Sequence, residues 1–212
     1  GPAPRRRHPA IHQRGSVNIA VIDNGGGNVA SIVYALDRLG ARACLTTDPS
    51  RISKATHVIL PGVGAAADAM SRLRSAGLDQ LLPTLRQPVL GICLGMQLLH
   101  AHSEGGDVTC LGILPGHVRR LQIPLPVPHM GWNRLHIDRD HPLLEGIGPQ
   151  PYVYFVHSYA VTPDDFTLAH AQYGVPVSAA VSRGNFHGVQ FHPERSAAVG
   201  AQILRNFLTL ES

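Results

Sequence analysis

The sequence predicts a single α/β domain with a mostly parallel central sheet flanked by helices, plus a strand-rich antiparallel section in its C-terminal half. The 212 residues are 44% hydrophobic and 15% charged, as in a globular chain of one domain or two small ones. In the first half, short apolar runs alternate with amphipathic segments, which is typical of βαβ units. From about residue 112, short β-forming segments separated by turns replace this alternation.

The first half supplies the parallel strands and the helices that cover them. Residues 17–23 (VNIAVID) are predicted as a buried strand, followed by the turn GGGN. Residues 29–40 then show helical periodicity and end at a glycine. Further strands are predicted at 41–47, 56–62 and 87–93, and helical segments at 65–77, 78–85 and 94–102.

The second half is predicted to be rich in short strands that are partly antiparallel. They fall at 116–123, 134–139, 152–161, 167–173, 176–184 and 186–191. The segment 196–210 is an amphipathic helix. Its apolar side consists of Val199, Ile203, Leu204, Phe207 and Leu208.

The formal charge of +4 is concentrated in the first sixteen residues. That stretch holds four arginines and no acid, and the rest of the chain carries equal numbers of acidic and basic residues. We therefore expect residues 1–16 to be a flexible basic tail, either natural or left from cloning, and 17–212 to be the domain. A basic arm for RNA or anionic lipid is the alternative for the tail. The neutral body carries no footprint for nucleic acid, so no nucleic-acid partner is expected.

The three cysteines, Cys44, Cys93 and Cys110, follow no disulfide spacing, which favours a reducing compartment and hence the cytoplasm. Cys44 and Cys110 have apolar neighbours and are interpreted as small core residues. No apolar run approaches the roughly 20 residues that cross a bilayer, so no membrane association is expected. The histidines give no metal-ligand pattern, and we predict no metal and no cofactor.

The strongest chemical signal is Gly91-Ile92-Cys93-Leu94-Gly95, at the junction of a predicted strand and helix. This G-x-C-x-G pattern is the cysteine counterpart of the nucleophile turn of hydrolases. Glycines two residues either side of the nucleophile avoid clashes in a sharp turn, and the helix N-terminus favours a thiolate. Taken alone, the pattern fits a core cysteine at an ordinary turn equally well.

A candidate base decides between these interpretations. The sequence GVQFHPE (188–194) places His192 at the end of a predicted strand, where the active sites of parallel sheets gather. Glu194 lies two residues later and can fix the histidine tautomer. Together with Cys93 they make a nucleophile, a base and an orienting acid.

GICLGMQLL around Cys93, with HPE about a hundred residues later, resembles the class I (triad) glutamine amidotransferases, which have a flavodoxin-like fold. The resemblance covers nearly the whole chain after residue 16. It implies a glutaminase that forms a cysteinyl thioester. It implies an oxyanion hole made by the amides of Val63 and Leu94. It also implies contacts between glutamine and the following residues: Gly62, Gln97, Ser158 and Tyr159.

The segment PHMGWN (128–133), on a predicted loop, resembles the subfamily of glutaminases that serve histidine biosynthesis. Those subunits pass ammonia to a cyclase of (β/α)8-barrel type that makes imidazole glycerol phosphate. A one-to-one heterodimer is therefore expected. The interface residues that the resemblance implies are Asn28, His129, Met130, Trp132, Asn133 and Arg195.

Two positions depart from the family pattern. Relatives usually show Ser-Glu-Glu after the nucleophile helix, and the second Glu meets the substrate ammonium; here the run is Ser103-Glu104-Gly105. We assign that role to Glu104, with a shift of the loop as the alternative. Relatives also often have Lys after HPE, where this chain has Arg195, which keeps the charge but changes the geometry.

Three rival functions fit the sequence less completely. Gly25-x-Gly27-x-x-Ala30 with Asp48 about 20 residues later fits a dinucleotide-binding turn, but leaves Cys93 and His192 unexplained. A catalytically silent regulatory module would be marked by loss of a triad residue, and all three are present. An amidotransferase for anthranilate, guanylate or carbamoyl phosphate is disfavoured by PHMGWN.

Overall fold

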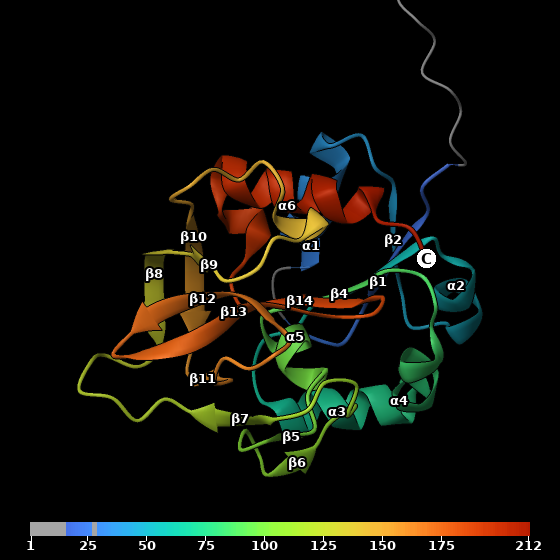
Figure 1. Ribbon diagram of the computed structural model, residues 1–212. Helices are drawn as coiled ribbons and strands as arrows, with labels where there is room; N and C mark the ends of the chain where they lie inside the picture. Colours follow the sequence, from blue (N-terminus) through green and yellow to red (C-terminus); the bar gives the residue numbers. More distant parts are fainter. Residues whose placement is uncertain (1–15, 27–28) are drawn as a thin grey trace, which may run out of the picture.

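An eight-stranded sheet forms the centre of the molecule in the computed structural model, which describes residues 16–26 and 29–212 (Figure 1). The strand order is β2 (Ala43–Thr46), β1 (Ile19–Ile22), β3 (His57–Leu60), β4 (Val89–Ile92), β14 (Phe186–Val189), β13 (Val175–Arg183), β12 (Thr167–Tyr173) and β9 (His136–Ile137). The first five strands are parallel, and the last three continue the sheet in antiparallel pairing. The predicted parallel first half and antiparallel extension are both confirmed.

Helices cover both faces of this sheet (Figure 1). One face carries α1 (Val29–Arg38) and α6 (Ala197–Thr209), and the other carries α2 (Pro49–Lys54), α3 (Ala66–Ser75), α4 (Leu78–Leu81) and α5 (Leu94–Leu98). A hydrophobic core lies on each face of the sheet. Because side chains alternate along a strand, β1 contributes to both cores: Ile19 and Val21 pack on the face of α1 and α6, and Ala20 and Ile22 pack on the other face. Three short 3-10 turns complete the helical segments: η1 (Leu82–Thr84), η2 (Pro142–Leu144) and η3 (Pro193–Arg195).

Two smaller sheets lie beside the central one. The strands β8 (His129–Arg134) and β10 (Tyr152–His157) form an antiparallel pair, here called the β8–β10 pair. The other sheet has the order β11 (Tyr159–Ala160), β7 (His117–Arg120), β5 (His102–Ser103) and β6 (Val108–Thr109). Since β10 leads directly into β11, the turn between them joins the two small sheets.

The structure corrects three local predictions. The segment 128–133, predicted as a loop, forms strand β8 because residues 129–134 pair with β10. The helix predicted at 94–102 ends at Leu98, and the chain then enters β5 at His102. Helix α2 was not predicted; at six residues it is too short to show periodicity, and it begins with Asp48 as its cap and Pro49 in its first turn. No helix in the described part of the chain is both long and apolar enough to span a membrane.

Candidate active site

Cys93 lies at a strained turn between β4 and α5. Its φ of 55° is a left-handed conformation that residues other than glycine rarely adopt. A Cβ atom on Gly91 would lie 2.6 Å from the Gly95 carbonyl oxygen, and one on Gly95 would overlap the Leu60 carbonyl oxygen. The two glycines are thus needed for close approach of the backbone, as the sequence pattern predicts.

The Cys93 thiol is buried and lies among polar atoms. Its Sγ is 3.6 Å from the carbonyl oxygen of Val156 on β10. From the other side, Gln190 Nε2 donates to the same sulfur at 3.7 Å. The Cys93 amide donates to the Val189 carbonyl at 2.8 Å, which fixes the turn against β14.

His192 follows β14 and lies beside Glu194, as predicted from the HPE tripeptide. Its Nδ1 is 2.7 Å from Glu194 Oε1, and both side chains are almost completely buried. Its other ring nitrogen, Nε2, is buried and makes no hydrogen bond within the described residues. Burial alone would lower the pKa of His192, but the interactions with Cys93 and Glu194 outweigh burial and hold that pKa above its ordinary value. The site therefore favours the imidazolium form.

A cavity of about 330 Å³ opens over the nucleophile. It is lined by Val63, Gly64, Cys93, Leu94, Gln97, Pro128, Val156, His157, Ser158 and Tyr159. The structure thus brings six residues predicted to serve catalysis or substrate binding to one cavity, although they come from separate segments of the chain. The carboxyl ends of β4 and β14 meet at this edge of the sheet, which is where parallel sheets place their sites.

The Leu94 amide, predicted as one half of the oxyanion hole, is already hydrogen-bonded. It donates to the Gly62 carbonyl oxygen at 3.3 Å. That carbonyl belongs to the same peptide unit as the Val63 amide, and the two point in opposite directions in a trans peptide. In this conformation the Val63 N–H therefore points away from the nucleophile turn, and the predicted pair of donors is not assembled.

Gln97 on α5 is buried, and its side-chain amide is held in two directions. Its Nε2 donates to the Tyr159 carbonyl oxygen and to Gln190 Oε1, both at 3.0 Å. Sequence reasoning missed Gln190 and the role of His157, which lines the cavity. The one sequence feature that could have indicated them is their position in a predicted strand, where alternate side chains point toward the core.

Glu104, predicted to meet the substrate ammonium, is exposed and does not line the cavity. Its Oε2 accepts from the Arg120 amide at 2.8 Å, which ties the turn after β5 to β7. The contact with glutamine stays a prediction, and it requires this carboxylate to leave its present partner.

The residues predicted to meet a partner fall into two groups. Met130 and Trp132 are exposed, at 62% and 54% of their surface, and Arg195 is exposed with its guanidinium 4.2 Å from the centre of the Tyr154 ring. His129 is instead buried, because on strand β8 it points inward while its neighbours point outward. Asn133 is half-buried.

Asn28 lies outside the described residues. So does Gly27, which belongs to the rival dinucleotide-binding turn. The acid of that rival pattern has a different task in the structure: Asp48 Oδ1 accepts from the Ser50 amide at 2.9 Å and caps α2. The carboxylate of this rival pattern is thus engaged in capping a helix.

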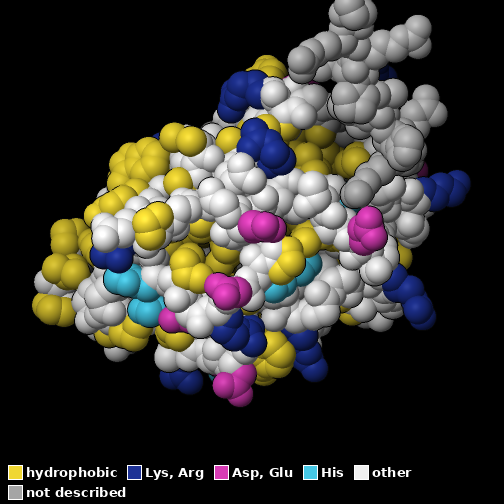
Figure 2. Space-filling model, turned by 45° about the horizontal axis from the view of Figure 1, so that its top comes forward, with side chains coloured by type: hydrophobic (Ala, Val, Ile, Leu, Met, Phe, Trp, Pro, Cys, Tyr) yellow, Lys and Arg dark blue, Asp and Glu magenta, His cyan; other side chains and the backbone are white. Residues whose placement is uncertain are grey.

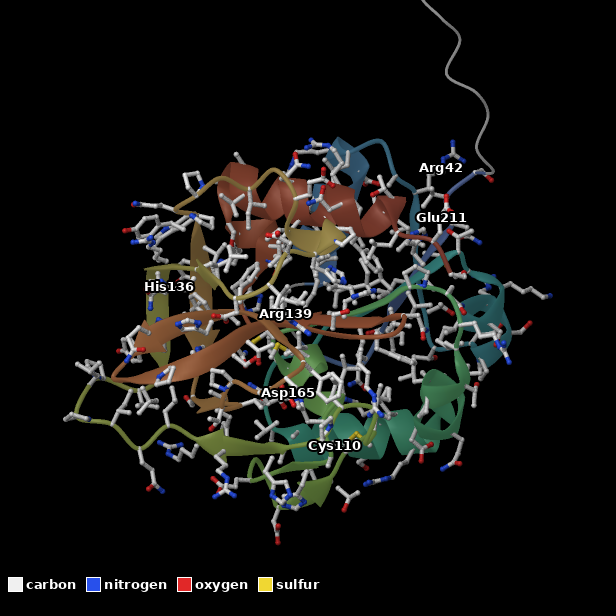
Figure 3. All side chains as sticks on the ribbon, viewed as in Figure 1. Arg42, Cys110, His136, Arg139, Asp165 and Glu211 are labelled. Carbon is white, nitrogen blue, oxygen red and sulfur yellow. The ribbon has the colours of Figure 1, made fainter. Side chains whose placement is uncertain are left out.

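The other two cysteines lie away from the site. Cys110 packs in the core beside α3, and burial raises the pKa of its thiol to about 11 (Figure 3). Cys44 is half-buried on the edge strand β2, with Arg51 Nη1 3.5 Å from its sulfur. Within residues 16–26 and 29–212, no group of three or more His, Cys, Asp or Glu side chains is placed to hold a metal ion.

Known proteins resemble the chain over most of its length. The model of the family Glutamine amidotransferase class-I matches residues 20–210. Imidazole glycerol phosphate synthase subunit HisH 2 of Legionella pneumophila (strain Paris) is 54% identical over 196 residues, which cover 92% of this chain and 98% of that protein. Imidazole glycerol phosphate synthase subunit HisH of Vibrio cholerae is 46% identical over 200 residues, covering 91% and 98%. Among solved structures, a glutamine amidotransferase superposes with a TM-score of 0.71 at 22% identity, covering 90% of this chain and 96% of that one, which shows a shared fold.

Proposed function

The chain belongs to the class-I glutamine amidotransferase family, and from that premise we propose that it is the glutaminase subunit of an imidazole glycerol phosphate synthase. It hydrolyses glutamine to glutamate and ammonia, and a cyclase partner uses the ammonia in histidine biosynthesis. The lyase chemistry of the synthase belongs to the partner. Two curated relatives of that name, 54% and 46% identical to the chain, support this function.

The observation that carries the proposal is that His192 interacts with both Cys93 and Glu194, while Cys93 opens onto the cavity of about 330 Å³. Each has the environment that its role requires. Cys93 is lifted out of the sheet by a strained turn, His192 is held by a 2.7 Å hydrogen bond, and Glu194 is buried beside it. A structural cysteine would need neither the left-handed turn nor the buried ion pair.

The reaction proceeds in two steps at Cys93. The thiolate attacks the side-chain amide carbon of glutamine, and His192 protonates the nitrogen, which leaves as ammonia. Water, deprotonated by His192, then attacks the thioester; the C–S bond breaks, glutamate leaves, and the Cys93 thiolate is restored beside the His192 imidazolium. Glu194 fixes the imidazole tautomer and stabilises its charged form in both steps.

Each tetrahedral intermediate carries an oxyanion that needs donors. In the described conformation the Leu94 amide is engaged by the Gly62 carbonyl. A rotation of the Gly62–Val63 peptide would free the Leu94 amide and turn the Val63 amide toward the oxyanion. Glycines on both sides of Val63 make such a rotation sterically accessible. The described conformation is therefore a low-activity state, and the partner is the natural trigger.

The proposed docking surface is the outward side of the β8–β10 pair. Met130, Trp132 and Tyr152 are the exposed large apolar side chains of these two strands. Figure 2 shows hydrophobic side chains gathered at the left end of the molecule, where the β8–β10 pair lies in Figure 1. An aromatic patch of this kind suits a protein partner. We propose a (β/α)8-barrel cyclase in a one-to-one complex, located in the cytoplasm.

The test is to purify the chain with a candidate cyclase and measure glutamate release with and without that partner. We expect low activity from the chain alone and a higher rate from the complex, with a further rise when the cyclase substrate is present. Full activity of the isolated chain would contradict the coupled function. No glutamate release under any of these conditions would overturn the glutaminase assignment.

A further inference from the structure

Four hydrogen-bonded residues cross from β8 to the substrate cavity. Asn133 Nδ2 lies 3.3 Å from His129 Nε2. His129 Nδ1 lies 2.9 Å from Nε2 of His157, and His157 Nδ1 lies 2.8 Å from the carbonyl oxygen of Tyr159. We call Asn133, His129, His157 and Tyr159 the histidine row. It links the strand that carries the proposed docking surface to the turn of Ser158 and Tyr159, which is predicted to contact the substrate glutamine.

The row continues to the nucleophile through two glutamines. The Tyr159 carbonyl that accepts from His157 also accepts from Gln97 Nε2 at 3.0 Å. Gln97 Nε2 donates in addition to Gln190 Oε1 at 3.0 Å, and Gln190 Nε2 donates to Cys93 Sγ at 3.7 Å. Every contact from β8 to the sulfur is thus a hydrogen bond between identified atoms.

The cavity end fixes the direction of the hydrogen bonds. A carbonyl oxygen only accepts, so Nδ1 of His157 must carry a proton. In a neutral imidazole the other nitrogen is then an acceptor, so His129 must donate from its own Nδ1 to His157 Nε2. This leaves Nε2 of His129 as an acceptor.

The hydrogen bonds at the β8 end of the histidine row independently require the same donor-to-acceptor direction. Asn133 Oδ1 accepts from the Arg134 amide at 2.7 Å, and Asn133 Nδ2 donates to the Gln172 carbonyl at 3.0 Å. These two backbone groups fix which end of the side-chain amide is nitrogen. The second N–H of that nitrogen faces Nε2 of His129, which must therefore accept. Both ends require the same Nδ1–H tautomer of both histidines.

Protonation of His157 would place two N–H groups against each other across the 2.9 Å contact, and protonation of His129 would place its Nε2–H against the N–H of Asn133 Nδ2. The surroundings also disfavour charge. His129 is stacked between Phe155 and Tyr173, at ring distances of 4.7 Å and 3.9 Å. Burial lowers the pKa of His129 and of His157 to about 4.

We infer that His129 and His157 are positioning residues of the glutaminase site, held neutral in the Nδ1–H form, which fix the Ser158–Tyr159 turn and Gln97 and tie them to strand β8. This inference rests on the proposed function. All four ring nitrogens are engaged in hydrogen bonds, so neither histidine is free to exchange a proton with the substrate. Since Met130 and Trp132 alternate with His129 and Asn133 along β8, a shift of the docking surface would move the row.

The first test is spectroscopic and needs only the full-length chain. Long-range ¹H–¹⁵N correlation of histidine-labelled protein at pH 7 identifies which ring nitrogen carries the proton. Assignment uses single substitutions of His129 and His157. We expect both to be neutral and protonated on Nδ1. An Nε2–H tautomer or an imidazolium form at either position would overturn the inference.

The second test measures glutamine turnover by the complex. His129→Leu removes the donor to His157, and His129→Asn keeps an N–H group at the δ position. We expect about a tenfold rise in KM for glutamine in His129→Leu with a smaller change in kcat, and substantial rescue in His129→Asn. The rate with ammonium salt in place of glutamine should stay unchanged in both variants.

His187→Leu is the matched control. His187 is equally buried, its pKa is also lowered to about 4 by burial, and its Nδ1 lies 2.9 Å from Ser182 Oγ, outside the row. If His129→Leu and His187→Leu give the same KM, or if His129→Asn gives no rescue, the inference fails while the proposed function stands. If the wild-type complex does not hydrolyse glutamine, the proposed function itself fails.

Discussion

The nucleophile turn and the β8–β10 pair meet at the same cavity but are built differently. The turn is made by five consecutive residues, and its shape depends on backbone contacts that exclude side chains at Gly91 and Gly95. The β8–β10 pair joins segments far apart in sequence, with Phe155 opposite Gly131. It carries exposed apolar side chains on one side and buried histidines on the other. The turn positions the nucleophile through local backbone contacts, whereas the β8–β10 pair reaches from the proposed docking surface to the cavity through long-range strand pairing.

Two buried histidines, one beside the nucleophile turn and one on the β8–β10 pair, differ in the direction of their pKa shifts. His192 belongs to the nucleophile side, where Cys93 and Glu194 hold its pKa above the ordinary value against the effect of burial. His157 belongs to β10, where burial dominates and lowers its pKa to about 4. Two imidazoles that interact electrostatically thus favour opposite protonation states. An acid-base group needs the first environment, and a fixed hydrogen-bond donor needs the second.

The largest effect is expected at the nucleophile itself. Cys93→Ala should lower glutamine-dependent turnover by at least about 10⁴-fold, because no other thiol can form the thioester. Folding and partner binding should persist. Cys110→Ala, at a buried thiol beside α3, is the control and should retain activity. Glutamate release by Cys93→Ala near the wild-type rate would remove the nucleophile assignment.

The turn's steric requirement predicts the next effect. Gly95→Ala should destabilise the fold by more than about 4 kcal/mol, because its Cβ would overlap the Leu60 carbonyl oxygen. Gly112→Ala is the matched control: Gly112 has a positive φ, of 66°, but its Cβ would meet nothing within 4 Å, so about 1–2 kcal/mol of strain is expected. Urea unfolding of both variants measures the difference. Equal losses would show that the turn is not sterically constrained.

Glu194→Gln should lower kcat by about 100-fold. The amide can still orient His192, but it gives weaker support to the imidazolium form. In a serine protease the corresponding change costs about 10⁴-fold, and a thiolate that is already formed should lose less. Steady-state assays of the complex check this, with His192→Ala expected to lose more. An unchanged rate for Glu194→Gln would mean that this carboxylate has no part in catalysis.

Trp132→Ala tests the proposed docking surface on the β8–β10 pair. We expect weaker binding of the cyclase or a roughly tenfold loss of the partner's stimulation, since coupling between sites is typically about 1–3 kcal/mol. Labelling of Cys93 by a glutamine-analogue electrophile should be retained in the isolated chain. Val175→Ala, at an exposed apolar side chain of β13, serves as the control. A Trp132→Ala complex with normal affinity and stimulation would rule out this docking surface.

Acidification should lower the stability of the fold through three buried histidines. His129, His157 and His187 have a folded-state pKa of about 4, against about 6.5 when unfolded. The unfolded chain therefore binds more protons at these three positions between the two values, so their contribution to stability should be full above about pH 6.5 and fall as pH decreases toward 4. Unfolding midpoints measured across this range check the sign. A stability that rises on acidification would contradict the neutral assignment.

The sequence was sufficient for the nucleophile turn and the HPE segment because both are local: the residues that shape each of them lie within a few positions of one another. The parallel strands were also predictable, since each is a short, mostly apolar segment between turn or helical segments. Strand β8 was missed because its pairing partner lies about twenty residues away. The row from Asn133 to Tyr159 could not be predicted, since it depends on which way each strand turns its side chains.

Two assignments carried over from the family resemblance needed the structure for a different reason. Glu104 has the right residue type, yet its carboxylate is bound to the Arg120 amide. Leu94 lies at the right position, yet its amide is bound to Gly62. A motif identifies which residue can serve a role, and its hydrogen-bond partners decide whether it does so in a given conformation.

In the proposed function, the ammonia released at Cys93 passes directly to the cyclase partner. The most direct measurement follows ¹⁵N from amide-labelled glutamine into the cyclase product in the presence of excess unlabelled ammonium. We predict that the product carries ¹⁵N with little dilution in the wild-type complex, and none in the Cys93→Ala complex. A product whose nitrogen matches the isotopic composition of the bulk ammonium would contradict this account.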